Sequence, residues 1–293
     1  MDDRWNSQTT DSEEEQDGGG EVELVEIELL LEGLYRVYGF DFRNYVRSSI
    51  RRRIMNRVRM DNLPTITALL DRVLHDRYEA NKLLEDFSIH VTEMFRDPGF
   101  FFAFRQKVVP LLRELSEIRI WHAGCSTGEE VYSMAILLQE EGLGEKTQIF
   151  ATDMNERILE KARTGAFPLT RMQGYTRNYL LAGGTQEFSA YYTTDHEYAY
   201  FHPSLRESTM FFQHNLATDC SFHEFHVIIC RNVFIYFNPE LQAQVHRLFG
   251  DSLHETGILA LGSKESLIHV GHPGRYEPID PVSKIYRKVA ESR

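Results

Sequence analysis

Residues 118–130 of this 293-residue chain read IRIWHAGCSTGEE. The apolar run Ile118–Ala123 predicts a short buried strand. Gly124 and Gly128 predict a tight turn, which leads into a helix over Glu129–Leu138. Glycine at the carboxyl end of a strand lets a ligand approach the backbone closely. The alternative interpretation is a tight turn and a capped helix that bind nothing.

The acidic side chain of Glu129 indicates which ligand this turn would accept. The turn departs from the G-x-G-x-x-G pattern, because only two of its glycines are present. A carboxylate at the start of the helix would repel a pyrophosphate, whereas it would attract a cationic group. Asp153 ends the next predicted strand, Thr147–Thr152, and could accept hydrogen bonds from both hydroxyls of an adenosine ribose. A helix cap is the alternative role for Asp153.

Strands and helices alternate through most of the chain after residue 118. Further strands are predicted at 210–213, 225–230, 257–262 and 283–289, and helices at 155–163 and 239–253. This alternation is typical of a doubly wound, largely parallel α/β sheet. The alternation fails over residues 167–203, where Tyr191, Thr193 and residues 198–201 favour short strands. We therefore expect a small antiparallel β insertion there.

The first part of the chain predicts a separate all-helical domain over residues 21–90. Its apolar residues recur three and four apart, which indicates helices over 22–38, 46–58, 64–74 and 79–87. Residues 91–117 are expected to form a linker and a connecting helix that starts at Asp97-Pro98 and is interrupted at Pro110. The α/β domain would then cover residues 118–293.

Charge is distributed unevenly along this acidic chain, whose formal net charge is −12. Residues 1–20 hold seven acids and one base and end in three glycines, which predicts a disordered acidic tail. Residues 41–60 hold seven arginines and one aspartate. Arg43, Arg47 and Arg51 repeat every four residues on one helix face, and Arg52 lies beside them. Nucleic acid is a poor fit as a partner because the helical domain as a whole is acidic.

The composition excludes several classes of protein. No run of about 18 apolar residues occurs, so we expect no membrane-spanning helix, and the acidic first residues predict no secretory signal. Three cysteines without a C-x-x-C spacing favour a reducing, cytoplasmic location and argue against a sulfur-ligated zinc site. His214, His223 and His226 straddle a strand and a loop without a second matching set, so no metal site is predicted.

Six blocks of sequence together carry a resemblance to a known family. They are HVTEMFRD at 90–97, AGCSTGEE at 123–130, ATD at 151–153, NL at 215–216, CRNVFIYF at 230–237 and GSKESL at 262–267. In this order and spacing, the chain resembles the bacterial chemotaxis receptor methyltransferases, the CheR-type protein-glutamate O-methyltransferases. The resemblance covers roughly residues 25–290. It implies a Rossmann-like methyltransferase domain with a small β insertion, preceded by an all-α domain.

The resemblance also implies S-adenosylmethionine as methyl donor and S-adenosylhomocysteine as product. By position, Thr92 and Arg96 are expected at the methionine end of the donor, Glu129 at its α-amino group and Asp153 at its ribose. Arg96 and Tyr236 are the expected catalytic residues, beside the transferred methyl group and the incoming carboxylate. The remaining expected cofactor-binding residues are His90, Gly124, Asn215, Leu216, Arg231 and Asn232.

Two positions depart from the family's pattern. The family often has Asn at the position of His90, although His can also donate a hydrogen bond. Lys264 stands where the family commonly has His. The resemblance implies a monomeric enzyme that forms glutamyl methyl esters on the cytoplasmic helical bundle of chemoreceptors. A methyltransferase of a non-receptor signalling protein and a non-catalytic S-adenosylmethionine-binding module are the alternatives.

The arginine-rich helix has a use in this interpretation, because the family's receptor substrates are long acidic helices. Arg43, Arg47, Arg51 and Arg52 could dock on such a surface through bidentate contacts with carboxylates. A solvated face, or internal pairing with the acids at residues 21–32, is the alternative. In some members of the family the β insertion grips a receptor peptide, and residues 167–203 do not indicate whether this one does.

Overall fold

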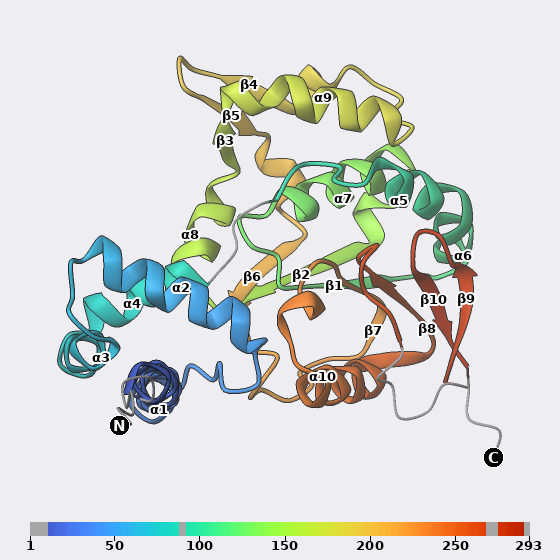
Figure 1. Cartoon of the computed structure of the whole chain (residues 1–293). Coiled ribbons are helices and arrows are strands. Elements are labelled where there is room, and N and C mark those ends of the chain that lie inside the picture. The colour runs from blue at the N-terminus through green and yellow to red at the C-terminus, as the bar shows by residue number, and fades with distance from the viewer. Residues whose placement is uncertain (1–10, 88–91, 268–274, 290–293) are drawn as a thin grey trace, which may run out of the picture. The chain divides into compact units, whose positions relative to one another are not determined.

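The computed structural model of this protein describes residues 11–87, 92–267 and 275–289. The chain forms two compact units, which divide between Ser88 and Ile89 (Figure 1). The first unit is all-helical and the second is an α/β unit with a mostly parallel sheet. The predicted fold class is therefore confirmed.

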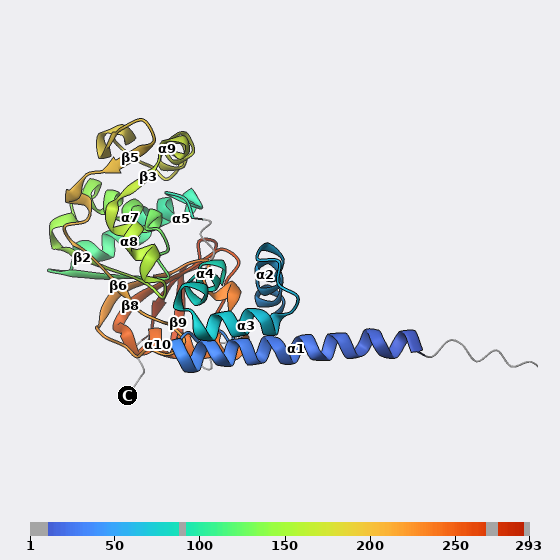
Figure 2. The ribbon, with the colours of Figure 1, turned by 90° about the vertical axis from the view of Figure 1, so that its left-hand side faces the viewer.

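The first unit holds four helices in the part of the chain that the structure describes. They are α1 (Asp11–Tyr38), α2 (Arg47–Met60), α3 (Ile66–His75) and α4 (Arg77–Phe87). Helix α1 lies alongside α3 (Figure 2). The buried residues recur at helical spacing, as Leu30 and Leu34 do in α1 and Ile50 and Ile54 do in α2. Each helix thus buries one apolar stripe against its neighbours.

The prediction of a disordered tail over residues 1–20 is wrong for its second half, because α1 begins at Asp11. Each of the three glycines at 18–20 disfavours a helix by about 1 kcal/mol relative to alanine. Once a helix is nucleated, however, each added residue contributes a further backbone hydrogen bond. The buried residues of α1 lie in its second half, and the helix extends from there through the glycines. Residues 1–10 lie outside the described residues.

The second unit is built on a seven-stranded sheet in the order β6-β2-β1-β7-β8-β10-β9. Its strands are β1 (Ile118–Ala123), β2 (Thr147–Asp153), β6 (Thr209–Gln213), β7 (Phe225–Cys230), β8 (Leu253–Leu261), β9 (Tyr276–Asp280) and β10 (Ile285–Lys288). All neighbours are parallel except β8–β10 and β10–β9. Strand order reverses between β1 and β7, and a ligand site is expected at the carboxyl ends of the strands at such a point.

Helices cover both faces of this sheet. Helices α7 (Glu129–Glu140) and α8 (Glu156–Thr164) lie on one face, and α10 (Pro239–Ser252) lies on the other (Figures 1 and 2). The central strands β1, β2 and β7 are buried along nearly their whole length, as expected for strands covered on both faces. Within the described ranges, no helix has the length and apolar composition needed to cross a membrane.

The segment before the sheet contains α5 (Pro98–Ala103), a π-helical turn at Phe104–Val108 and α6 (Val109–Arg113). The expected interruption at Pro110 takes the form of this π-helical turn. Proline has no backbone N–H and its ring crowds the preceding turn, which explains why regular α-helical bonding changes just before it.

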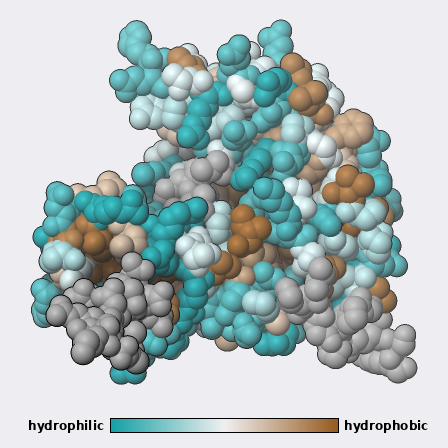
Figure 3. Space-filling model, in the orientation of Figure 1, coloured by the Kyte–Doolittle hydropathy of each residue, from teal (hydrophilic) through white to brown (hydrophobic). Residues whose placement is uncertain are grey.

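The insertion contains a three-stranded antiparallel sheet in the order β3-β5-β4. The strands are β3 (Ala166–Pro168), β4 (Tyr192–Thr194) and β5 (Tyr198–Phe201). It also contains a helix, α9 (Met172–Leu181), that the sequence prediction missed. Met172, Tyr175 and Tyr179 are buried at helical spacing, but Gly174 and the neighbouring polar residues obscure this pattern. The lobe projects beyond α7, and its outer surface is mainly hydrophilic (Figures 1 and 3).

Candidate functional site

The turn after β1 brings its backbone close to the loop that follows β7. Gly124 has φ +77°, and a Cβ atom on it would lie only 2.7 Å from Cγ2 of Val233. The N–H of Gly124 donates to the carbonyl of Thr152 at 2.8 Å, which joins the ends of β1 and β2. Val233 thus packs closely against Gly124 at the point where strand order reverses, and only glycine fits there.

Strained backbone is concentrated around this turn. Six non-glycine residues in the described chain have positive φ, and four of them lie in the site segments: Phe95, Asp97, Ser126 and Asn232. This conformation disfavours residues with a Cβ by about 1–2 kcal/mol each. Strain of this kind persists where the surrounding structure imposes it, and it is frequent at ligand sites. Two of the four flank Arg96, one of the expected catalytic residues.

Asp153 lies at the carboxyl end of β2, as predicted. Its Oδ2 accepts from the N–H of Ser126 at 3.0 Å, and its Oδ1 accepts from the N–H of Asn155 at 3.1 Å. Burial raises the pKa of Asp153 despite these hydrogen bonds. Asn155, rather than Asp153, caps α8 by accepting from the N–H of Arg157. The helix-cap alternative for Asp153 is therefore not needed, and its carboxylate keeps acceptor capacity for a ligand.

Glu129 is the first residue of α7, and only 2% of its surface is exposed. Thr127 donates through Oγ1 to Oε2 at 2.6 Å. Among the described residues, the contacts of Oε1 are long, 3.5 Å to the hydroxyl of Tyr175 and 3.6 Å to Nη1 of Arg171. Burial raises the pKa of Glu129. A cationic group beside Oε1 would relieve this electrostatic penalty.

Arg231 follows β7 and makes a network of its own. Its side chain is 1% exposed, with Nη1 2.7 Å from Oε2 of Glu130 and Nη2 2.7 Å from Oδ2 of Asp97. Nη1 also donates to the carbonyl of Arg96 at 3.4 Å, and the guanidinium stacks over the ring of Phe100 at 4.1 Å. The guanidinium is thus engaged with protein groups. The expected contact between Arg231 and the methyl donor would therefore involve the backbone of Arg231. Its side chain holds the Arg96–Asp97 segment.

The loop after β7 is fixed from the other side by a second buried acid. Glu265 accepts from the N–H of Phe234 at 2.8 Å and from the N–H of Gly262 at 2.5 Å. Asn232 has φ 63° and lies between these contacts. A Cβ atom on Gly262 would lie 2.8 Å from the backbone nitrogen of Asn232. Tyr236 ends a short 3-10 turn at Phe234–Tyr236. The backbone geometry around Asn232 and Tyr236 is therefore set by Glu265.

The remaining expected cofactor residues lie around the same edge of the sheet, with one exception. Asn215 and Leu216 follow β6, where Asn215 accepts through Oδ1 from the N–H of Ala217 at 3.0 Å and Leu216 is buried. Thr92 lies in the segment that leads to Arg96 and lines a cavity. His90 lies outside the described residues.

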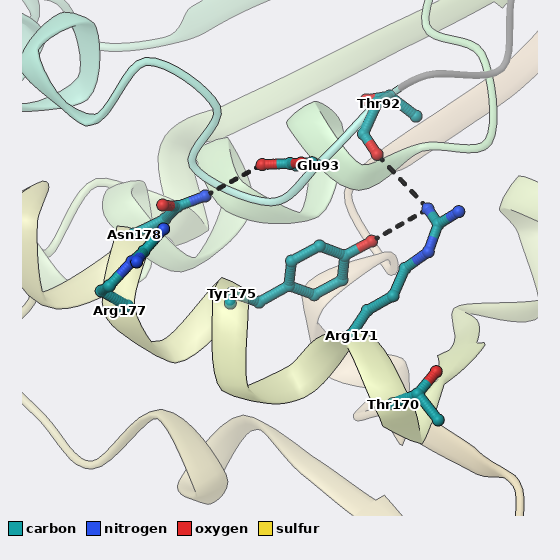
Figure 4. Close-up of a pocket in the computed structure, with 8 residues that line it drawn as sticks. Thr92, Glu93, Thr170, Arg171, Tyr175, Arg177 and Asn178 are labelled. Carbon is teal, nitrogen blue, oxygen red and sulfur yellow. Dashed lines mark hydrogen bonds between the residues drawn. The ribbon is translucent and has the colours of Figure 1, made fainter.

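A cavity of about 370 Å³ lies between the Thr92–Glu93 segment and α9 (Figure 4). Asn178 donates to the carbonyl of Met94 at 3.1 Å, and Arg171 donates to the carbonyl of Thr92 at 3.4 Å. The insertion therefore packs on the segment that carries Thr92 and Arg96. The sequence prediction missed these insertion residues, although Arg171, Tyr175 and Asn178 recur at helical spacing and could have indicated one helix face.

The predicted docking arginines lie in the first unit, and three of them are paired internally. Arg43 binds Glu32 at 3.1 Å and also binds Asp41. Arg47 binds Glu28 at 3.1 Å, and Arg51 binds Glu23. Glu23, Glu28 and Glu32 belong to α1, which matches the alternative of internal pairing. The side chain of Arg52 is exposed and makes no ion pair with the described residues.

Comparisons with known proteins agree with this geometry. Residues 90–281 match the family model described as "CheR methyltransferase, SAM binding domain", and residues 25–88 match "CheR methyltransferase, all-alpha domain". The chain belongs to the CheR methyltransferase family. It is therefore an S-adenosylmethionine-dependent methyltransferase, and S-adenosylmethionine is its cofactor. Among the described residues, no group of three or more His, Cys, Asp or Glu side chains could hold a metal ion.

Individual relatives of this CheR-family protein cover most of its length. Cher3 of Pseudomonas putida is 49% identical over 90% of this chain and 97% of its own. The chemotaxis protein methyltransferase of Listeria innocua is 29% identical over 80% of this chain and 87% of its own. That of Escherichia coli is 26% identical over 81% and 82%, respectively.

Proposed function

We propose that this enzyme transfers the methyl group of S-adenosylmethionine to glutamate side chains of chemoreceptors and forms glutamyl methyl esters. The observation that carries the proposal is the tie from Arg231 to the carbonyl of Arg96 and to Asp97. This tie joins the segment of Arg96 to the end of β7, from which Tyr236 follows. The segment that carries Arg96 is thereby held beside the loop that carries Tyr236, which supports a shared role for these two residues. Relatives named chemotaxis protein methyltransferases support the receptor as substrate.

The residues at this edge fit the charges of the methyl donor. Glu129 is buried, and its Oε1 is 3.6 Å from the Arg171 guanidinium, longer than a direct hydrogen bond, so this carboxylate suits the α-ammonium group. Asp153 has acceptor capacity for ribose hydroxyls. The Oγ of Ser126 is buried without a hydrogen-bond partner in the described chain and could bind a polar ligand atom.

Methyl transfer to a carboxylate requires alignment rather than a strong base. A glutamate side chain with an ordinary pKa near 4.3 is already ionised at neutral pH. When bound, S-adenosylmethionine supplies a methyl group on a sulfonium, whose carbon–sulfur bond breaks toward sulfur as the ester bond to oxygen forms. Arg96 would orient a carboxylate, and Tyr236 would position the reacting groups. A strong hydrogen bond to the attacking oxygen would lower its nucleophilicity, so we propose orientation as their main role.

The acceptor in this proposal is an acidic helix in the cytoplasmic part of a receptor. Arg52 presents an exposed guanidinium to such a partner. Arg43, Arg47 and Arg51 are paired with exposed or partly exposed acids of α1, and exposed ion pairs are weak. An acidic receptor helix could therefore exchange with the acids of α1. Each methylation converts a charged glutamate into a neutral ester.

The test is incubation with methyl-labelled S-adenosylmethionine and receptor-containing membranes, followed by mild alkali. Glutamyl methyl esters release volatile methanol under these conditions. We expect volatile label from receptor bands with the wild type, and its loss in Arg96→Ala and Asp153→Ala. Base-stable label would overturn the ester assignment, and volatile label from other proteins alone would indicate a non-receptor signalling substrate. Binding of S-adenosylhomocysteine without any label would favour the non-catalytic module.

A further inference from the structure

The cavity beside α9 contains a guanidinium that is held only loosely. Arg171 lies between the carbonyl of Thr92 and the hydroxyl of Tyr175 (Figure 4), with Nη1 3.4 Å from each oxygen. These distances are long for hydrogen bonds to a charged donor. The side chain of Arg171 is 48% exposed. Its guanidinium therefore lines the cavity and keeps hydrogen-bonding capacity for a ligand.

A buried anion lies directly beside this guanidinium. The Oε1 atom of Glu129 is 3.6 Å from Nη1 of Arg171, which is longer than a direct hydrogen bond. The carboxylate of Glu129 is buried, whereas the guanidinium of Arg171 faces the cavity. A carboxylate next to an open guanidinium matches the two charges of an α-amino acid: the ammonium pairs with Glu129 and the α-carboxylate pairs with Arg171.

The start of α9 favours a carboxylate at the same end of the cavity. Thr170, Arg171 and Gly174 line the cavity where α9 begins, and a helix N-terminus stabilises negative charge. The acid among the lining residues is Glu93, whose Oε2 lies 3.4 Å from Nδ2 of Asn178, farther along the helix. The cavity lining thus holds two arginines, Arg171 and Arg177, against one acid, Glu93, and Arg171 is the arginine that lies beside Glu129.

We propose that Arg171 binds the α-carboxylate of the donor's methionine end and is a specificity-determining residue contributed by the insertion. The proposal rests on the assignment of Glu129 to the α-ammonium group. It means that the insertion does more than present a surface to the acceptor, because its helix α9 supplies part of the donor site. Occupancy of that site would then be coupled to the position of α9.

The experiment compares two ligands by isothermal titration calorimetry, without any protein acceptor. S-Adenosylhomocysteine carries the α-carboxylate, and S-adenosyl-3-thiopropylamine is the same molecule without it. We expect the wild type to prefer S-adenosylhomocysteine by about tenfold or more, as a charge-assisted contact would give. Arg171→Gln should lose most of this preference and bind the thiopropylamine as the wild type does. Arg171→Lys, which retains the charge, should restore part of the preference.

Two further variants separate this proposal from its competitors. Arg177→Gln changes another arginine that lines the same cavity and should keep the wild-type preference. If Arg96→Gln removes the preference while Arg171→Gln retains it, the carboxylate binds at Arg96 and the proposal is overturned. It is also overturned if Arg171→Gln and Arg171→Lys both keep the full wild-type preference for S-adenosylhomocysteine, because the α-carboxylate then does not depend on Arg171. Failure of the receptor assignment leaves this test unaffected, because no acceptor is present.

Discussion

The Nη2 atom of Arg231 lies 2.7 Å from Oδ2 of Asp97, and the same guanidinium lies 2.7 Å from Oε2 of Glu130. This pair of contacts ties the end of β7 to α7 and to the strained segment around Arg96. Removing the cation would leave Glu130 buried without its main partner. Arg231 also lowers the pKa of Glu130, against the effect of burial. We therefore regard Arg231 as a positioning residue for Arg96.

The first prediction concerns stability. Arg231→Met should lower the free energy of unfolding by about 3 kcal/mol, since breaking a buried ion pair strands a charge. Urea denaturation measures this difference. Arg113→Met is the matched control, because Arg113 also binds a carboxylate, that of Glu141 at 2.8 Å, but is 53% exposed. That control should lose no more than about 1 kcal/mol. Equal losses in the two variants would contradict the proposed role of Arg231.

The second prediction separates backbone strain from close approach at the turn after β1. Gly124 and Gly142 have similar backbone angles, φ +77° and φ +69°, but a Cβ on Gly142 would meet no atom within 4 Å. Gly142→Ala should therefore cost only the strain, about 1–2 kcal/mol. Gly124→Ala should lower the free energy of unfolding by more than this, because the new Cβ would clash with Val233. The same substitution should also weaken the binding of S-adenosylhomocysteine.

Thermal unfolding and calorimetric titration of both variants check this prediction. Gly142 lies just after α7 and away from the carboxyl edge of the sheet, so Gly142→Ala should leave the affinity for S-adenosylhomocysteine unchanged. Similar stability for the two variants, together with unchanged ligand affinity in Gly124→Ala, would show that the close approach at Gly124 has no role in binding.

The third prediction concerns pH. Burial raises the pKa of Glu129, and an ammonium group beside it would favour the ionised form and lower that pKa. S-Adenosylhomocysteine then binds more weakly at acidic pH, because protonated Glu129 carries no charge to pair with the ligand's ammonium group. The affinity for S-adenosylhomocysteine should fall as pH decreases, and the fall should begin above the ordinary glutamate pKa of about 4.3.

Calorimetric titrations across this pH range provide the measurement. Glu129→Gln should bind more weakly at neutral pH and show a smaller pH dependence. Some dependence should remain in this variant, because the pKa of Asp153 is also raised by burial. If the affinities of the wild type and Glu129→Gln change with pH in the same way, the ammonium group does not bind at Glu129. Asp153→Asn supplies the complementary profile, in which the Glu129 contribution is retained.

The sequence predicted those parts of the fold and site whose causes are local. Gly124 follows β1 and Asp153 ends β2, so the local pattern sufficed to place both residues at the carboxyl ends of strands. Contacts between distant segments could not be predicted in this way. Arg171 reaches Thr92 across 79 positions, and Arg231 reaches Asp97 across 134. Nothing in the local sequence of Arg231 reveals that the two carboxylates of Asp97 and Glu130 engage its guanidinium.

The arginine-rich helix illustrates the same limit. Its period of four residues predicted a charged face, but the partners of that face come from α1, up to 28 positions away. The sequence left docking and internal pairing open, and the structure contains the internal pairs for Arg43, Arg47 and Arg51. The two interpretations remain compatible only if an acidic partner can replace the acids of α1.

The last prediction tests this exchange. Arg52→Ala should lower kcat/KM for receptor methylation severalfold at low ionic strength and less at high salt, because its exposed charge would steer an acidic helix. The affinity for S-adenosylhomocysteine should not change. Glu23→Gln should act in the opposite direction, because it releases Arg51 from its partner and makes a second guanidinium available. Methylation rates at two ionic strengths distinguish these effects. If neither variant alters the salt dependence, receptor docking does not use this surface, and the arginines serve only to hold α1 against α2.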